Sequence, residues 1–398
     1  MLKELYIENY KSLKNVTVQF KDGLNIIIGK NGSGKSNLLE FINTDANLKP
    51  FFVYENNFKF ASDYMYIFSY RQEQKKIEVT FEVKSEYTTE NDKPKHIQHV
   101  HISWKNENDS DPFLATEYTF PDQLSWINLN KILDDLFQIR DFKVNLIEFN
   151  IPSSLFWLDR PASFSVNKNN HLYYFLERAL DGFSLTFLFG YFFEQKLYEE
   201  KNSIKLENEI NNIKSIFIES FNIFKNEHNI DGALKLFSPI EEIRIGTNIN
   251  IYKVDGKILI DNLTLEFKVN DSWIPWNYLS DGTKRLFYLI TEMSCQKHGL
   301  ILIEEPELGI HPHQLYKLMQ FIKEQSEEKQ IIISTHSPVV LDALDPDELD
   351  RITIAKIEDG GSKFYKLTDE QKSKGSEYMK EVGELSYYWL HSDLEEDD

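Results

Sequence analysis

The sequence predicts an α/β fold that combines a parallel core sheet, an antiparallel β part and an inserted helical lobe. Short, largely apolar runs at residues 24–28, 300–303 and 331–333 are typical of buried strands in a parallel sheet. Residues 76–83 and 96–104 instead alternate apolar and polar side chains, as half-buried antiparallel strands do. The first three runs therefore predict the core, and the last two predict the antiparallel part.

Periodicity predicts the remaining elements. Residues 1–10 mix charged with alternating apolar side chains, which favours a first strand over a signal peptide. Apolar residues recur every three or four positions from Leu206 to Phe224, which predicts one face of a helix. The most apolar stretch, at 172–193, is too interrupted to cross a membrane and is expected to form a buried helix. Three charged residues interrupt it: Glu177, Arg178 and Asp181.

A glycine-rich loop follows the run at 24–28 and leads into a helix. From Gly29 to Ser36 it has the spacing G-x-x-x-x-G-K-S, in which the glycines let backbone N–H groups turn inward around phosphates. Lys35 is expected to reach the β and γ oxygens, Ser36 to offer a hydroxyl to Mg²⁺, and the helix to add its positive dipole end. A glycine-rich turn that binds nothing is the disfavoured alternative, because strand and helix flank the loop. The predicted triphosphate cradle comprises Gly29, Lys30, Asn31, Gly32, Ser33, Gly34, Lys35, Ser36 and Asn37.

Two carboxylates follow the apolar run at 300–303. Glu304 and Glu305 are expected at the C-terminal end of a central parallel strand, where α/β proteins build their sites. In an ATPase the first carboxylate would hold Mg²⁺, often through water, and the second would orient or deprotonate the attacking water. We therefore predict Glu304 as a metal ligand and Glu305 as a catalytic residue, against the alternative of an exposed acidic turn.

A histidine follows the run at 331–333. His336 is expected at the same sheet edge as Glu305 and is predicted to contact the γ-phosphate, the alternative being a purely structural histidine. A further polar segment, 279–285, opens a helix over 286–293. Ser280 and Gly282, with the free N–H groups of that helix, predict a second phosphate-binding surface; a simple N-cap at Ser280 is the alternative.

These clusters occur in an order that resembles the ATP-binding-cassette (ABC) ATPases of the SMC, RecF and OLD (overcoming lysogenization defect) kind. Residues 7–13 look like their opening strand, 29–36 like Walker A and 279–284 like the signature. Residues 300–305 look like Walker B and His336 like the switch histidine. The resemblance covers roughly positions 1–45 and 275–345.

The resemblance implies an ABC ATPase head, in which a RecA-like core sheet is joined by an antiparallel β subdomain. It places the nucleotide-binding core at 1–50 and 275–360, the inserted β-rich and helical lobe at 51–274, and a short acidic tail at 361–398. It also implies ATP and Mg²⁺ as cofactors, and a homodimer or larger homo-oligomer in which Walker A of one copy and the signature of another enclose the nucleotide.

Two features depart from the family pattern. Glu304 stands where family members usually have Asp, which bears on the rate of hydrolysis. The Q-loop glutamine has three unconvincing candidates: Gln72, Gln74 and Gln138.

Composition limits the partners. The 398 residues carry a formal net charge of −20, so nucleic acid contact is expected only locally, where basic residues cluster. Cys295 is the only cysteine, which excludes an internal disulfide and is consistent with a reducing cytoplasm. No membrane partner is expected.

The leading functional hypothesis is a cytoplasmic ATPase that acts as a sensor or regulator in a bacterial anti-phage defence system. Residues 304–312 look most like OLD-type and defence-associated ATPases, whereas the stretch after residue 350 is too short for the Toprim nuclease of OLD proteins. A separately encoded effector, expected to be a nuclease, is therefore predicted. The alternatives are a RecF- or SMC-like DNA repair ATPase and a nucleotide-dependent oligomeric scaffold with little turnover.

Overall fold

The computed structural model describes residues 2–46, 59–72, 75–90, 93–106, 114–120, 145–147, 162–166, 209–254, 257–295 and 300–391. The chain forms two units. The first contains Met1–Ile147, His298–Pro306 and Ile322–Asp398, and the second contains Glu148–Lys297 and Glu307–Phe321. The division at residues 50, 274 and 360 that the sequence suggests stays a prediction.

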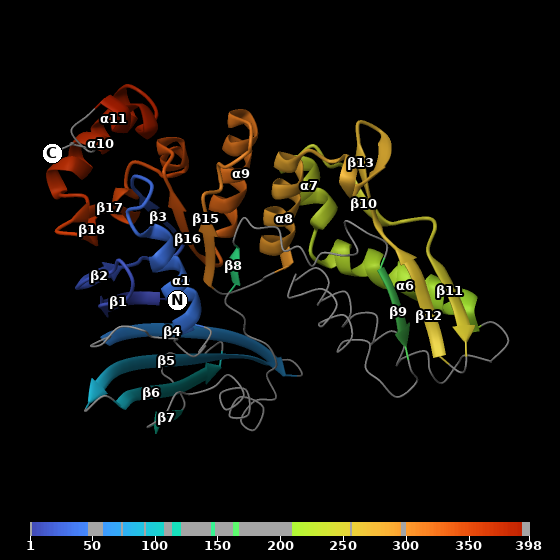
Figure 1. Ribbon diagram of the computed structural model, residues 1–398, viewed down its shortest axis with the longest axis horizontal. Helices are drawn as coiled ribbons and strands as arrows, with labels where there is room; N and C mark the ends of the chain where they lie inside the picture. Colours follow the sequence, from blue (N-terminus) through green and yellow to red (C-terminus); the bar gives the residue numbers. More distant parts are fainter. Residues whose placement is uncertain are drawn as a thin grey trace. The chain divides into compact units, whose positions relative to one another are not determined.

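A six-stranded sheet forms the core of the first unit (Figure 1), in the order β18-β17-β3-β16-β15-β8. Neighbouring strands from β17 to β8 are parallel, and β18 pairs antiparallel with β17 at one edge. Every residue of β3 and β16 is buried, as expected of central strands covered on both faces. The predicted parallel core is thus confirmed. Its strands are β3 (Leu24–Ile28), β8 (Asn145–Ile147), β15 (Leu300–Glu304), β16 (Gln330–Thr335), β17 (Ile352–Glu358) and β18 (Gly361–Lys366).

A second, antiparallel sheet in the same unit has the order β2-β1-β4-β5-β6-β7. The first strand of the chain lies within it, between β2 and β4. The two segments with alternating side chains form β5 and β6, which are strands of an antiparallel sheet as predicted, and the structure pairs them with each other. This sheet contains β1 (Leu2–Glu8), β2 (Val16–Gln19), β4 (Lys59–Gln72), β5 (Lys75–Glu90), β6 (Lys93–Asn106) and β7 (Leu114–Phe120).

Helix α1 (Lys35–Ala46) follows β3 and packs against the core sheet at β15, β16 and β8. Its buried face consists of four apolar side chains, Leu38, Leu39, Phe41 and Ile42. The helix starts where Gly34 ends the loop, and the backbone N–H of Leu38 donates to the carbonyl of Gly34 at 3.0 Å. Packing on the sheet therefore fixes the first turn of α1 beside the ends of the core strands.

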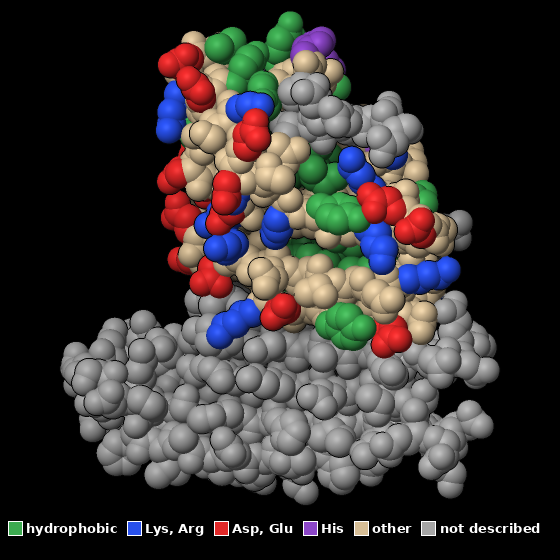
Figure 2. Space-filling model, turned by 90° about the vertical axis from the view of Figure 1, so that its left-hand side faces the viewer, with side chains coloured by type: hydrophobic (Ala, Val, Ile, Leu, Met, Phe, Trp, Pro, Cys, Tyr) green, Lys and Arg blue, Asp and Glu red, His purple; other side chains and the backbone are tan. Residues whose placement is uncertain are grey.

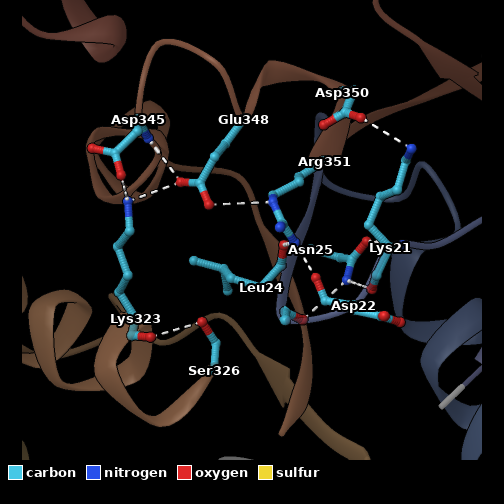
Figure 3. Close-up of polar contacts among 11 residues, drawn as sticks. Lys21, Asp22, Leu24, Asn25, Lys323, Ser326, Asp345, Glu348, Asp350 and Arg351 are labelled. Carbon is cyan, nitrogen blue, oxygen red and sulfur yellow. Dashed lines mark hydrogen bonds and ion pairs between the residues drawn. The ribbon is translucent and has the colours of Figure 1, made fainter. Parts of the chain in front are cut away.

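A polar network lies at the N-terminal end of β3, at the other end of this strand from the glycine-rich loop (Figure 3). Arg351 donates to the carbonyls of Asp22 and Leu24, the latter at 3.3 Å, and its Nε lies 3.3 Å from Glu348. Glu348 also pairs at 2.8 Å with Lys323, near the C-terminal end of α9 (Pro312–Gln325). These contacts tie the loop before β3 to residues more than 300 positions later in the chain.

The residues after β18 are folded as far as His391. Helix α10 (Asp369–Glu381) begins with a capping box, in which the Thr368 hydroxyl accepts from the backbone N–H of Gln371 at 3.2 Å. Helix α11 (Leu385–His391) buries Leu385 and Trp389. The segment predicted as an acidic tail thus supplies β18 and two helices, while residues 392–398 lie outside the described residues.

The second unit contains two three-stranded antiparallel sheets, in the orders β10-β13-β14 and β11-β12-β9, together with helices α6, α7 and α8. The predicted helix at 206–224 is confirmed as α6, except that Leu206 lies outside the described residues. The strands are β9 (Ala162–Val166), β10 (Glu242–Ile245), β11 (Asn250–Val254), β12 (Lys257–Leu263), β13 (Leu265–Val269) and β14 (Ser272–Pro275). The helices are α6 (Glu209–Glu227), α7 (Ile230–Phe237) and α8 (Asp281–Cys295).

An aromatic cluster forms part of the core of this unit. The ring centroids of Phe267, Trp276 and Phe287 lie 5.0–5.7 Å apart, and α8 buries most of its apolar side chains. Among the described helices, none combines the length and apolar character needed to cross a bilayer. The apolar stretch at 172–193 lies outside the described residues.

Candidate nucleotide-binding site

The glycine-rich loop connects β3 to α1 in a conformation that requires its glycines. Gly32 and Gly34 have φ values of +82° and +91°, in the region that side-chain-bearing residues rarely adopt. A Cβ atom on Gly29 would lie 2.2 Å from the carbonyl oxygen of Ala355, so a neighbouring strand excludes any side chain there. The loop can therefore bring its backbone close to a ligand.

Lys35 lies along this loop. The residue is only 6% exposed, and its Nζ donates to the carbonyls of Gly29 at 2.8 Å and Lys30 at 3.0 Å. The Ser33 hydroxyl is buried and has no hydrogen-bond partner among the described residues. A cation beside an unsatisfied hydroxyl and glycine backbone fits a polyphosphate, whose oxygens accept from all of these groups.

Ser36 and Glu304 meet although 268 positions separate them. The Ser36 hydroxyl, in the first turn of α1, donates to Oε1 of Glu304 at the end of β15. Hydroxyl and carboxylate oxygens are ligands that Mg²⁺ accepts, together with water and nucleotide phosphates. No cluster of three or more His, Cys, Asp or Glu that could hold a metal occurs in the described part of the chain. These two residues thus fit an Mg²⁺ ion that phosphate oxygens help to bind.

Glu305 and His336 also lie together. Glu305 follows β15 and His336 follows β16, and the His336 Nδ1 lies 3.3 Å from Oε1 of Glu305. The two side chains are 28% and 39% exposed, so both are accessible at this sheet edge. Glu305 has a φ of +46°, and its backbone N–H donates to the carbonyl of Ser334 at 2.7 Å. A left-handed conformation at a non-glycine residue costs about 1–3 kcal/mol and is concentrated at functional sites.

The structure therefore brings four predicted groups together at one edge of the core sheet. The cradle, Glu305 and His336 follow β3, β15 and β16, and Glu304 is the last residue of β15; these strands are neighbours whose ends lie in register. Asn31 and the other cradle residues lie in the same loop, and Asn37 lies on α1. This agrees with the expectation that parallel strands deliver their chemistry at their C-terminal ends.

Two serines beside the cradle were not predicted. Ser12, in the turn after β1, accepts a hydrogen bond from Nδ2 of Asn37 at 2.8 Å. Ser362, on β18, donates to the Ser12 hydroxyl at 2.8 Å. Ser12 falls within the opening segment that resembles the family, but nothing in the sequence near Ser362 signals its place beside the cradle.

The predicted signature residues lie in the second unit. The Ser280 hydroxyl accepts from the backbone N–H of Thr283 at 3.2 Å, so Ser280 is the N-cap of α8. A Cβ atom on Gly282 would lie 2.6 Å from the carbonyl oxygen of Gly309, which explains the glycine. The N-cap geometry is thus observed, and a phosphate-binding role for Ser280 and Gly282 stays a prediction.

Which of the three candidates is the Q-loop glutamine stays untested. Gln72 is the last residue of β4, where the backbone alone is described, and Gln74 and Gln138 lie outside the described residues.

Two family models match the chain, and each contains a different part of the candidate site. A family model described as "AAA domain, putative AbiEii toxin, Type IV TA system" matches residues 117–342, more than half of the chain. The chain belongs to this AAA family. A second model, described as "AAA ATPase domain", matches residues 1–152. The cradle lies in the second match, and Glu304, Glu305 and His336 lie in the first.

Individual relatives are similar over different lengths. The DNA replication and repair protein RecF of Thermoanaerobacter sp. (strain X514) is 37% identical over 68 residues, 17% of this chain and 19% of the relative. The DNA double-strand break repair Rad50 ATPase of Methanosarcina mazei is 59% identical over 39 residues, 10% of this chain and 4% of the relative. The AAA chain thus spans no more than a fifth of the length of these relatives. The Septu protein PtuA of Bacillus thuringiensis is 24% identical over 369 residues, 88% of this chain and 75% of the relative.

Among solved structures, the SMC head bound to the C-winged helix domain of ScpA aligns with 94% of this chain and 99% of that chain. The sequence identity is 16% and the TM-score is 0.49. The more specific resemblance to OLD-type ATPases that lack a Toprim domain stays a prediction.

Proposed function

We propose that this AAA protein binds and hydrolyses ATP with Mg²⁺ and acts as a sensor or regulator in a bacterial anti-phage defence system. One observation carries the enzymatic part: the cradle, the Ser36–Glu304 pair and the Glu305–His336 pair lie at one edge of three adjacent parallel strands. Phosphoryl transfer to water needs these groups in one place, because its catalysis depends on positioning and charge stabilisation.

Each side chain has a distinct role in this proposal. Lys35 exchanges its loop carbonyls for phosphate oxygens, and Ser36 and Glu304 bind Mg²⁺. Bound ATP supplies the phosphoanhydride bond that is cleaved. Glu305 orients a water molecule and accepts its proton, while His336, 3.3 Å from Glu305, donates a hydrogen bond toward the γ-phosphate.

The comparisons give little support to the DNA repair alternative. Relatives named as repair proteins match only 68 and 39 residues, whereas the Septu protein matches 369. Charge supports the same choice, since the chain carries a net charge of −20. Among the described residues on the face shown in Figure 2, Lys and Arg side chains are interspersed with Asp and Glu rather than gathered in one basic stripe. Nucleic acid contact is therefore proposed to be local at most.

Partners follow from the same proposal. The signature at Ser280 is proposed to complete the nucleotide site of a second copy, so ATP would promote a homodimer or a larger homo-oligomer. Loss of the γ-phosphate would then release or reorient the copies and pass a signal to a separately encoded effector, proposed to be a nuclease. A cytoplasmic location belongs to this proposal.

Substitutions in the site test the enzymatic part. Lys35→Ala is expected to abolish binding of fluorescent ATP, whereas Glu305→Gln is expected to bind ATP normally and to lose about 10²-fold or more in kcat. Glu370→Gln, which changes an exposed carboxylate on α10, is the matched control and should resemble the wild type. Unchanged turnover in Glu305→Gln would favour the scaffold alternative.

A plaque assay tests the biological part. Cells that carry the gene with its neighbouring genes are expected to reduce phage plating, and Lys35→Ala should remove the protection. The protein should also copurify with the product of an adjacent gene. Normal plating combined with increased sensitivity of a deletion strain to DNA damage would instead favour the repair alternative.

A further inference from the structure

Three polar side chains from separate elements meet behind the phosphate loop. Ser12 lies in the turn after β1, Asn37 lies on the first turns of α1, and Ser362 lies on β18. The Ser12 hydroxyl accepts two hydrogen bonds, from Asn37 Nδ2 and from the Ser362 hydroxyl, each at 2.8 Å. The Ser362 backbone N–H also donates to the Ser12 carbonyl at 2.7 Å. Ser12 is thus the central acceptor of the group.

The two hydroxyls occupy the space that a side chain at Gly34 would need. A Cβ atom on Gly34 would lie 2.0 Å from Oγ of Ser362 and 2.8 Å from Oγ of Ser12. Ser362 is only 1% exposed, so its position is set by its surroundings. The Lys363 Nζ, which donates to the Lys14 carbonyl at 2.9 Å, holds the same turn against β18.

We propose that Ser12, Asn37 and Ser362 form a clamp of positioning residues that keeps Gly34 and the start of α1 in the conformation that receives phosphates. The proposal rests on the nucleotide binding proposed above and assigns the clamp to affinity rather than to the chemical step. A loop already held in its binding conformation loses less conformational freedom when the ligand binds. None of the three side chains is required to touch the reacting atoms.

The affinity of the full chain for Mg·ADP tests this role, with a fluorescent ADP as the probe. Ser12→Ala removes the acceptor of two hydrogen bonds and is expected to weaken binding about tenfold. KM for ATP should rise by a similar factor, while kcat at saturating ATP should stay within about twofold. Ser12→Thr keeps the hydroxyl at a half-exposed position and should restore affinity.

The control is Thr368→Ala, which removes a hydroxyl from the capping box of α10. It is expected to lower the melting temperature without changing the affinity for ADP. Ser12→Ala with wild-type affinity would overturn the clamp, as would an equal loss of affinity in both variants.

Hydrogen exchange of the nucleotide-free protein gives a readout independent of catalysis. Amides at residues 29–37 should exchange faster in Ser12→Ala than in the wild type, and at the wild-type rate in Thr368→Ala. If the wild-type protein bound no ADP, the proposed function would fail. Exchange at these amides would still test whether the clamp holds the loop. Unchanged exchange in Ser12→Ala would overturn it.

Discussion

Replacing Lys366 by Met is expected to stabilise the protein at neutral pH. Lys366 ends β18, and its Nζ is buried without a hydrogen-bond partner among the described residues. The pKa of this amine is lowered from 10.5 to about 8, chiefly by burial; Asp350 opposes the shift, and the positive charges of Lys21, Arg351 and Lys372 add to it. A buried charge in this setting is a net cost to folding.

The size of the effect follows from that pKa. Each tenfold change in proton affinity is worth about 1.4 kcal/mol. Lowering the pKa from 10.5 to about 8 therefore means that the charged amine costs the folded state about 3 kcal/mol relative to the unfolded state. Side-chain relaxation and water access reduce this upper value, so we expect the Lys366→Met substitution to raise the free energy of unfolding by about 1–3 kcal/mol at pH 7.

The sign of the pH dependence gives a second check. Below pH 8 the amine is protonated in both the folded and unfolded states, so the full cost is present. Between pH 8 and 10.5 the unfolded chain binds more protons than the folded chain, so the contribution of Lys366 makes stability rise with pH. The Lys366→Met variant lacks this contribution.

Urea unfolding at pH 7 and at pH 9.5 measures both effects. Lys374→Met is the control, because Lys374 is 61% exposed and pairs with Glu370 on the surface of α10. Its stability should stay within about 0.5 kcal/mol of the wild type. A Lys366→Met protein less stable than the wild type at pH 7, or one with the same pH-dependent rise, would refute the reasoning.

Three further substitutions test other parts of the fold. Gly34→Ala places a Cβ against the Ser362 hydroxyl at a φ of +91°, and should cost about 2 kcal/mol or more in thermal unfolding and weaken ADP binding. Arg351→Met removes the donor to two carbonyls before β3, and should lower the free energy of urea unfolding by about 2 kcal/mol with unchanged ADP affinity. Thr368→Ala opens the capping box with Gln371 and should cost about 1 kcal/mol, read from the urea midpoint.

Three of the core strands, β3, β15 and β16, could be predicted because their signal is local. Runs such as 331–333 are short, apolar and followed at once by polar groups, which is typical of buried strands in a parallel sheet. The same pattern placed His336 beside Glu305, because parallel neighbours in register end at one edge. Prediction succeeded where a few consecutive residues determine both the strand and the position of its final side chain.

The edge at β17 and β18 could not be predicted in this way. Ile352–Glu358 joins the core sheet beside β3, although more than 300 positions separate the two strands. Nothing within either segment specifies that partner, since pairing is decided by packing of the whole unit. For the same reason the sequence did not indicate Ser362 behind Gly34, or the left-handed backbone of Glu305. Tertiary contacts set these conformations.

The order in which the strands occur along the chain affects when the nucleotide site can form during translation. Strand β3 leaves the ribosome early, but its neighbours β16 and β17 are made only after residue 330. A nascent chain that stops short of them has the glycine-rich loop without the sheet that supports it, and long-range pairing of this kind is slow to form. Incomplete translation products therefore lack the assembled candidate site, so the proposed ATP binding is expected only of molecules whose synthesis has passed this point.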